Sequence, residues 1–188
     1  MRIGILGGSF NPPHKLHYQM GEEVLKHDLV DGVIYVPTGD KYAKEELIKG
    51  FHRCNMLRLM GVEVSNYEIV RGASYTFETL DYFQEQYPDA EISFIMSTDL
   101  ILDIEKWKNP EYILTNYKII GIKRKGIEVE NLPAIYELYP GSLTMHDFDL
   151  EELSSTMIRE KIKKNDKNLT KYLDPKVLEY INVNELYK

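Results

Sequence analysis

Two histidines three positions apart could bind phosphate, because a histidine ring can donate hydrogen bonds to phosphate oxygens. His14 and His17 end the run GGSFNPPHKLH, which begins at Gly7 directly after the apolar segment 3–6. Glycines at the end of a strand let backbone N–H groups approach an anion closely. Open α/β sheets hold their ligands at such strand ends. The pattern therefore predicts a nucleotide phosphate site after a first strand.

The spacing of this run excludes two common phosphate-binding loops. The dinucleotide-binding fingerprint needs three glycines at fixed offsets, and the P-loop ends in Gly-Lys-Ser/Thr. Neither pattern fits residues 4–17. Pro12 and Pro13 instead stiffen the loop, because proline fixes φ and has no N–H donor.

A second group of residues that could bind an anion lies near the other end of the chain. The run LSSTMIR covers residues 153–159 and places three hydroxyl side chains at the predicted start of a helix. Helix N-termini attract anions, and Arg159 lies one turn further along, where its guanidinium could bind phosphate. Taken alone, the run is also typical of an ordinary helix cap followed by a surface arginine.

Together the two runs resemble the motifs of the nucleotidylyltransferase superfamily. The first resembles its His-x-Gly-His motif after a Gly-Gly-Ser/Thr-Phe-Asp/Asn-Pro turn, with Leu16 in place of the glycine, and the second resembles its SSTxIR motif. Further segments resemble one branch, the nicotinate or nicotinamide mononucleotide adenylyltransferases. These segments are ASYT at 73–76 with Thr79-Leu80, FIMSTD at 94–99, Trp107-Lys108 before Ile113-Leu114, Lys123-Arg124, and the closing run from Tyr172 to Tyr187.

The resemblance implies a Rossmann-like nucleotidylyltransferase fold and transfer of the adenylyl group of ATP, with Mg²⁺, to nicotinate or nicotinamide mononucleotide in NAD biosynthesis. It implies that His14, His17 and Arg159 are catalytic. The ATP-binding residues that it implies are Gly7, Gly8, Ser9, Phe10, His14, His17, Asp99, Ser155, Thr156 and Arg159. The acceptor-binding residues that it implies are Asn11, Lys44, Tyr75, Thr76, Trp107 and Arg124. No protein ligand for a metal ion is predicted.

Two of these assignments have an alternative structural explanation. Asp99 could accept hydrogen bonds from a ribose diol, or it could cap a helix that begins before residues 100–102. Trp107, the only tryptophan, could stack on a pyridine ring or pack in the core. Both alternatives stay open at the level of the sequence.

Three departures from the family pattern bear on the identity of the acceptor more than on the type of reaction. Leu16 and Ser97 stand where the family has glycine, and the Pro-Pro-His-Lys expected after Pro37 is absent. Lys41 or Lys44 could supply the lost positive charge. Two other functions therefore stay open, namely adenylyl or cytidylyl transfer to another phosphorylated acceptor, and nucleotide binding without catalysis.

Alternating strand and helix patterns predict an α/β fold, a doubly wound and mostly parallel sheet with right-handed crossovers. Strands are predicted over Arg2–Leu6, Gly32–Val36, Tyr67–Val70, Ile92–Met96, Lys118–Ile122 and Leu143–His146. Helices are predicted over Tyr18–Leu29, His52–Val62, Thr76–Gln86, Ser155–Lys164 and Asp174–Asn182. We expect one domain, 1–188, with a helical C-terminal part from about residue 151. The long segment 37–50 is predicted to be either a substrate lid or a solvated loop.

The composition limits the classes of partner. The 188 residues are 43% hydrophobic and 28% charged, which is typical of one soluble globular domain. A net charge of −7 argues against nucleic acids and membrane surfaces, which usually need a basic face. Cys54 is the only cysteine, and no apolar run approaches the roughly 18 residues of a membrane span. We expect a cytoplasmic protein. A homo-oligomer is compatible with the sequence.

Overall fold

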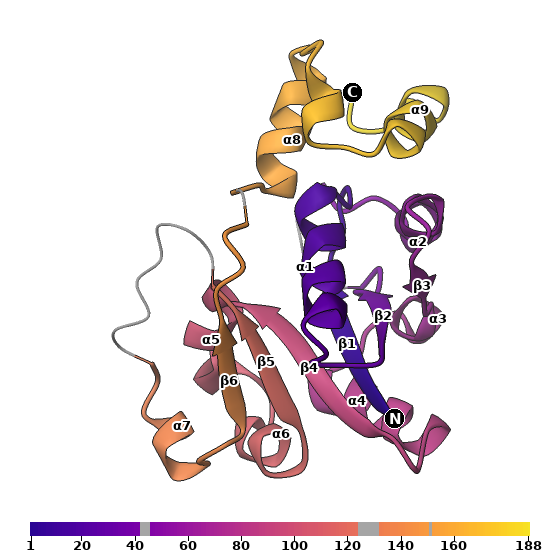
Figure 1. The fold of residues 1–188 in the computed structure, drawn as a ribbon. Coiled ribbons are helices and arrows are strands. Elements are labelled where there is room, and N and C mark those ends of the chain that lie inside the picture. The colour runs from indigo at the N-terminus through magenta and orange to yellow at the C-terminus, as the bar shows by residue number, and fades with distance from the viewer. Residues whose placement is uncertain (42–45, 124–131, 151) are drawn as a thin grey trace.

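The computed structural model describes residues 1–41, 46–123, 132–150 and 152–188. In these ranges six strands form one parallel sheet in the order β3-β2-β1-β4-β5-β6 (Figure 1). The strands are β1 (Arg2–Gly8), β2 (Gly32–Pro37), β3 (Glu63–Val64), β4 (Glu91–Ser97), β5 (Lys118–Ile122) and β6 (Leu143–His146). The strand order changes direction between β1 and β4, which confirms the predicted doubly wound sheet.

The central strands are buried on both faces, because alternate side chains enter two different apolar clusters. In β1, Ile5 packs in one cluster and Leu6 in the other, and in β4 the same holds for Phe94 and Ile95. This two-sided burial explains the short continuous apolar runs of the sequence.

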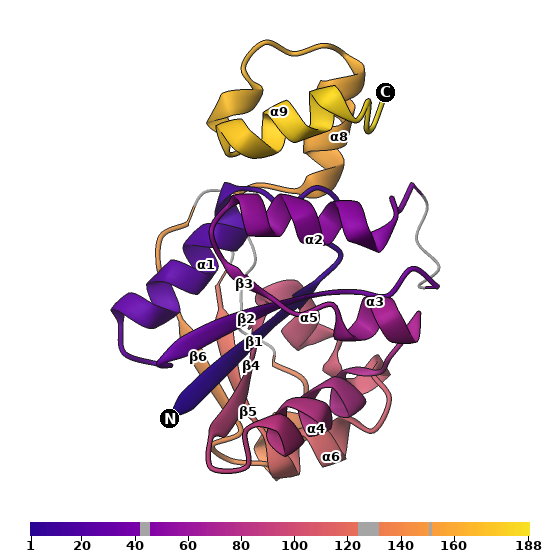
Figure 2. The ribbon, with the colours of Figure 1, turned by 90° about the vertical axis from the view of Figure 1, so that its right-hand side faces the viewer.

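Helices cover both faces of the sheet (Figure 2). The cluster that contains Ile5 also contains residues of α4 (Thr76–Gln86), α5 (Thr98–Leu102), the 3₁₀ helix η1 (Ile104–Lys106), α6 (Pro110–Asn116) and α7 (Ile135–Leu138). The cluster that contains Leu6 includes residues of α1 (Lys15–Lys26) and α2 (Gly50–Leu59). The helices predicted near these positions are therefore confirmed, with their bounds shifted by a few residues.

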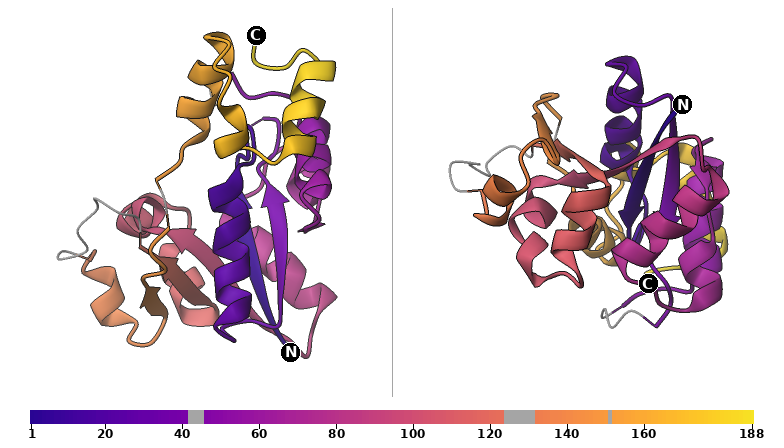
Figure 3. Two further views of the ribbon diagram at one scale, coloured as in Figure 1. Left: turned by 45° about the horizontal axis from the view of Figure 1, so that its top comes forward. Right: turned by 90° about the horizontal axis from the view of Figure 1, so that it is seen from below.

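Two C-terminal helices lie beyond the carboxyl ends of the strands (Figures 1 and 3). Helix α8 (Ser155–Lys163) is capped by Ser154, whose hydroxyl accepts the Met157 N–H at 3.2 Å. Helix α9 (Pro175–Val183) is capped by Asp174 and follows the 3₁₀ helix η2 (Leu169–Lys171). A third apolar cluster joins these helices to α2, and its buried members are Met56, Ile158, Ile162, Leu169, Leu173, Val177, Ile181 and Tyr187.

The prediction of a strand over residues 67–70 is wrong, because this segment forms helix α3 (Tyr67–Arg71). The Ser65 hydroxyl accepts the Tyr67 N–H at 3.3 Å, and Gly72 ends the helix with φ +82°, a conformation that glycine adopts most easily. Val70 is 77% exposed, so the apolar pattern of this segment does not mark a buried strand. The strand at this edge of the sheet is the two-residue β3.

Candidate functional site

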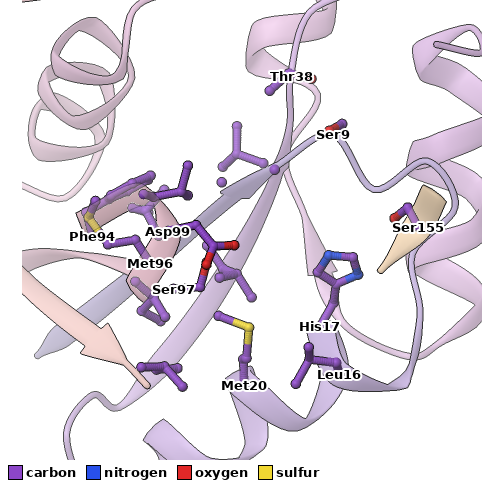
Figure 4. A pocket seen from close by; sticks show the side chains of 18 of the residues that line it. Ser9, Leu16, His17, Met20, Thr38, Phe94, Met96, Ser97, Asp99 and Ser155 are labelled. Atoms are coloured by element: carbon purple, nitrogen blue, oxygen red, sulfur yellow. The ribbon is translucent and has the colours of Figure 1, made fainter. Parts of the chain in front are cut away.

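A cavity of about 510 Å³ lies at the carboxyl ends of β1 and β4, where the strand order reverses. Open α/β sheets bind ligands at such a point, and the volume is typical of a small-molecule site. Figure 4 shows several of its side chains, among them His17, Asp99 and Ser155. The predicted site residues that line the cavity are Gly7, Gly8, Ser9, His14, His17, Thr76, Asp99, Trp107, Ser155 and Thr156.

Gly7 and Gly8 lie where side chains would collide with aromatic rings. A Cβ at Gly7 would lie 3.1 Å from the ring of Phe94, and one at Gly8 would lie 3.2 Å from the ring of Phe10. Glycine therefore allows the end of β1 to pack closely here and leaves its backbone open to the cavity. Phe10 is 1% exposed, and its ring packs edge-on against His17 with 4.9 Å between the centroids. The Phe10 ring thus packs against the His17 ring and helps to hold it in place.

His14 and His17 stack on each other at the start of α1, with 3.7 Å between their ring centroids. The His14 backbone N–H donates to Nδ1 of His17 at 3.1 Å. Because Nδ1 accepts this bond, the hydrogen-bond pattern assigns the proton of a neutral His17 ring to Nε2. Both residues line the cavity. His17 can therefore donate a hydrogen bond to an anion without first gaining a proton.

The run LSSTMIR is anchored to the backbone of the first run. The Ser155 hydroxyl donates to the Pro12 carbonyl at 2.9 Å, and the Arg159 guanidinium donates to the Asn11 carbonyl at 2.9 Å. These bonds join residues 143 and 148 positions apart in the chain. The positive end of α8 consequently lies beside the histidines. Arg159 and Phe10 themselves are not among the residues that line the cavity. We call the part of the cavity that is lined by residues 7–9, 14, 17 and 154–156 the phosphate end.

A buried arginine that the sequence analysis missed holds the loop after β1. Arg53 of α2 is fully buried and donates to the carbonyls of Ser9 at 2.9 Å and Thr38 at 2.6 Å. It donates to the Ile48 carbonyl at 3.0 Å and pairs with the Asp40 carboxylate at 2.8 Å. A buried charge needs such partners, so Arg53 fixes the ends of β1 and β2. Its position in an ordinary helical pattern gives no sequence signal for this role.

A second group of lining residues, which we call the tryptophan end, consists of Glu68, Ser74, Thr76, Thr79 and Trp107. Trp107 lines the cavity and also packs against the first core cluster, where its ring meets that of Phe94 in a T-shaped arrangement at 5.8 Å. Both roles considered for Trp107 are therefore compatible with its position.

Tyr75 lies at the margin of the tryptophan end. It precedes α4 and is 56% exposed, and it is not among the lining residues. Its backbone N–H donates to the Glu78 carboxylate at 2.8 Å, which orders the first turn of α4. Thr76 follows it and lines the cavity, so α4 presents its N-terminus to the tryptophan end.

Glu68 is a buried carboxyl group in the tryptophan end, and the sequence analysis missed it. Its side chain accepts a hydrogen bond from the Thr79 hydroxyl at 2.7 Å. Burial raises the pKa of Glu68 to about 7, although hydrogen bonds from Thr79 and the Gly39 backbone act in the opposite direction. Glu68 was missed because the segment was assigned to a strand with no cavity-facing role. It therefore titrates near neutral pH inside the candidate site.

Leu16, Ser97 and Asp99 also line the cavity. Leu16 is 6% exposed and packs in the same cluster as Met20, close to His17 in Figure 4. Ser97 ends β4 and occupies the N-cap position of α5, so Asp99 lies in the first turn of that helix and not at its cap. The Asp99 side chain faces the cavity together with that of His17 (Figure 4).

Not every predicted residue reaches the cavity. Asn11 is buried, its amide donates to the Glu46 carbonyl at 2.9 Å, and its Oδ1 accepts the Tyr187 hydroxyl at 2.9 Å. These contacts join the loop to the C-terminus, and a contact of Asn11 with the acceptor stays a prediction. Lys44 and Arg124 lie outside the described residues.

Residues 1–41, 46–123, 132–150 and 152–188 contain no group of three or more His, Cys, Asp or Glu placed to hold a metal ion. No helix in the same ranges is long and apolar enough to cross a bilayer. The described wall of the cavity carries the charged residues Glu68, Asp99, Lys123 and Glu152 besides the two histidines.

Comparisons with known proteins show the family of the chain. A family model described as cytidylyltransferase-like matches residues 5–161. The nicotinate-nucleotide adenylyltransferase of Bacillus subtilis (strain 168) is 36% identical over an alignment that covers 100% of this chain and 98% of that protein.

Two solved structures share the fold. They are the Plasmodium falciparum nicotinic acid mononucleotide adenylyltransferase complexed with NaAD, with a TM-score of 0.85, and the same protein complexed with APC, with a TM-score of 0.82. Both are 23% identical to this chain and cover 99% of it, and the match covers 97% and 96% of their own chains. At this identity the likeness establishes the fold.

Proposed function

The chain belongs to the nicotinate-nucleotide adenylyltransferase family, and on this premise we propose that it transfers the adenylyl group of ATP to nicotinate mononucleotide, which yields a dinucleotide and pyrophosphate. The observation that carries the proposal is the pair of hydrogen bonds from Ser155 and Arg159 to the loop before His14. They bring both nucleotidyl-transfer motifs to one cavity. Such a reaction belongs in the cytoplasm, where ATP and mononucleotides are found.

The phosphate end supplies charge neutralisation. A phosphate oxygen of the mononucleotide attacks the α-phosphorus of ATP, the bond to the bridging oxygen breaks, and pyrophosphate leaves with the electron pair. The attacking group is already an anion at neutral pH, so the reaction needs no general base. Nε2–H of His17 and the ring of His14 stabilise the charge on the transferred group, and the Arg159 guanidinium neutralises charge on the departing phosphates, as preorganised donors do.

The first turn of α8 and the glycine loop bind the rest of ATP in this proposal. Ser155 and Thr156 present hydroxyl and backbone donors at a helix N-terminus, which favours an anion. Gly7, Gly8 and Ser9 offer their backbone to the nucleotide. Asp99 accepts from a ribose hydroxyl, a role that its place on the cavity wall supports.

The tryptophan end binds the acceptor in this proposal. Trp107 stacks on the pyridine ring, and Thr76 directs its backbone amide toward the substituent of that ring. Since α4 begins at Thr76, its positive end favours a carboxylate substituent. This arrangement supports nicotinate over nicotinamide mononucleotide.

Mg²⁺ enters the proposal bound to the phosphates of ATP. The described residues offer it no cluster of protein ligands, and Mg²⁺ is commonly held by substrate phosphates and water with few carboxylates. When bound, it would lower the negative charge of the triphosphate. The steps above use only the groups of the chain.

Pyrophosphate release tests the proposal. The full-length protein is incubated with ATP or CTP and with nicotinate mononucleotide, nicotinamide mononucleotide or another phosphorylated acceptor, and the product is identified by chromatography. We expect the fastest release with ATP and nicotinate mononucleotide. Absence of release with ATP and either pyridine mononucleotide would overturn the assignment, and release with CTP or with another acceptor would replace it.

A further inference from the structure

One carboxylate bridges two cations of α8. The Glu46 side chain pairs with the Arg159 guanidinium at 3.2 Å and also with the Lys163 ammonium group. Arg159 and Lys163 are four positions apart on one helix, so they lie on the same face one turn apart. Glu46 comes from the segment between β2 and α2, far from α8 in the sequence. The structure thus contains an anion seated between two cations beside the phosphate end.

The arginine of this pair is held in place independently of Glu46. Its guanidinium donates to the Asn11 carbonyl at 2.9 Å and lies 3.4 Å from the Thr156 hydroxyl, which lines the cavity. The Arg159 side chain is only 14% exposed. A ligand that replaced Glu46 would therefore meet a guanidinium that is already oriented.

The carboxylate, in contrast, can leave without disturbing the backbone. The Glu46 carbonyl accepts the Asn11 amide at 2.9 Å, which anchors the main chain of residue 46. Its side chain is 49% exposed, so the carboxylate can rotate into solvent. The two cations lower the pKa of Glu46, mainly through its hydrogen bond with Lys163. It is consequently a charged ligand at neutral pH.

We infer that Arg159 and Lys163 together bind the terminal phosphates of ATP, and that Glu46 is an internal carboxylate which the triphosphate displaces. The inference rests on the proposed function for the orientation of ATP, and it adds Lys163 and Glu46 to the site. The α-phosphate lies at the histidines, the chain of phosphates passes Ser155 and Thr156, and its far end reaches the turn that carries Lys163. The same two cations then hold the departing pyrophosphate.

A purely structural ion pair would behave differently. Exposed pairs contribute little to stability, and removing either partner would then loosen the segment around residue 46 in the same way. In the displacement scheme the two partners have opposite effects on ATP affinity. Loss of Lys163 removes a phosphate ligand, whereas loss of the Glu46 charge removes a competitor.

Binding measurements on the full-length protein separate these cases without any need for turnover. Calorimetry with ATP, inorganic triphosphate and AMP compares the wild type with Lys163→Met, Glu46→Gln and the control Lys164→Met, which changes the neighbouring exposed lysine. We expect Lys163→Met to weaken ATP and triphosphate binding about fivefold, and Glu46→Gln to strengthen both about threefold, at low salt. AMP binding stays unchanged in both variants, and Lys164→Met changes none of the three ligands.

Two outcomes would overturn the inference. One is unchanged ATP and triphosphate affinity in Lys163→Met, and the other is weaker binding of both ligands in Glu46→Gln. Because these readouts use ATP and triphosphate alone, they hold or fail independently of which acceptor the enzyme uses. Equal unfolding temperatures of the variants and the wild type establish that each variant is folded.

Discussion

The phosphate end and the tryptophan end of the cavity are built from different interactions. At the phosphate end, Ser155 and Arg159 donate to main-chain carbonyls that lie 143 and 148 positions earlier in the chain, and His17 accepts a main-chain N–H. At the tryptophan end, an aromatic contact and a buried carboxyl group define the wall. Hydrogen bonds to the main chain fix the position of a few donor side chains. Their main-chain partners are present whatever the residue type, so only the donor residues need to be of a particular type. Side-chain packing can change with many residues, so we propose that the first end carries out a fixed reaction and that the second selects the acceptor.

The largest expected effect is at His17. In His17→Asn, the new side-chain oxygen can still accept the His14 N–H, but the donor at Nε2 is lost. We expect kcat to fall about 10²–10³-fold, as for the loss of one preorganised donor. Steady-state pyrophosphate release measures the change.

The control for this prediction is His17→Ala, which removes both the donor and the acceptor of the His14 N–H. It should lose activity to the same degree and also about 1 kcal/mol of stability. Near wild-type turnover in His17→Asn would show that the phosphate end acts without Nε2–H, and it would remove the contrast with the tryptophan end.

The next largest effect is on stability, through Glu68. Its pKa is raised from 4.5 to about 7 in the folded protein, so the folded state binds the proton more tightly than the unfolded state does. The resulting stability is fully present below about pH 4.5 and is lost as the pH rises through about 7. Glu68→Gln has no carboxyl group at this position, so its stability does not fall in this pH range. At pH 8 we expect it to be more stable than the wild type by up to about 3 kcal/mol.

Urea unfolding without nucleotide at several pH values measures this difference. The exposed Glu137→Gln on α7 serves as the control and should follow the wild-type curve. If the free energy of unfolding of Glu68→Gln and of the wild type changes with pH in the same way, ionising Glu68 does not destabilise the folded protein.

The two ends were also unequally predictable from sequence. The phosphate end depends on short runs with fixed spacing, GGSFNPPHKLH and SSTMIR, and their approach in space follows from a doubly wound sheet with C-terminal helices. Glu68 could not be predicted, because it lies on helix α3. The apolar residues of this segment had led to the prediction of a strand. The role of Arg53 depends on contacts with main-chain carbonyls, and the role of Glu46 depends on contacts with α8. Neither kind of contact has a pattern in the local sequence.

A smaller effect is expected at Trp107, and it tests the proposed division between the two ends. Trp107→Ala removes the ring that lines the tryptophan end, and aromatic stacking contributes about 0.5–1.5 kcal/mol. We expect the KM of nicotinate mononucleotide to rise about tenfold while the KM of ATP stays unchanged. If only the unfolding temperature falls and both KM values are unchanged, Trp107 is a core residue and the acceptor lies elsewhere.

The smallest effect is at the cap of α8, and it asks whether the phosphate end depends on helix order as well as on its donors. Ser154→Ala removes the hydroxyl that accepts the Met157 N–H and should cost about 1 kcal/mol of stability. Asp174→Ala is the matched control, because Asp174 caps α9 in the same way and should cost a similar amount. Only α8 carries Ser155 and Arg159, so fraying of its first turn should weaken ATP binding about twofold to threefold, whereas fraying of α9 should not. Equal ATP affinities in the two variants would mean that the bonds of Ser155 and Arg159 to the first loop hold the site together without help from the cap.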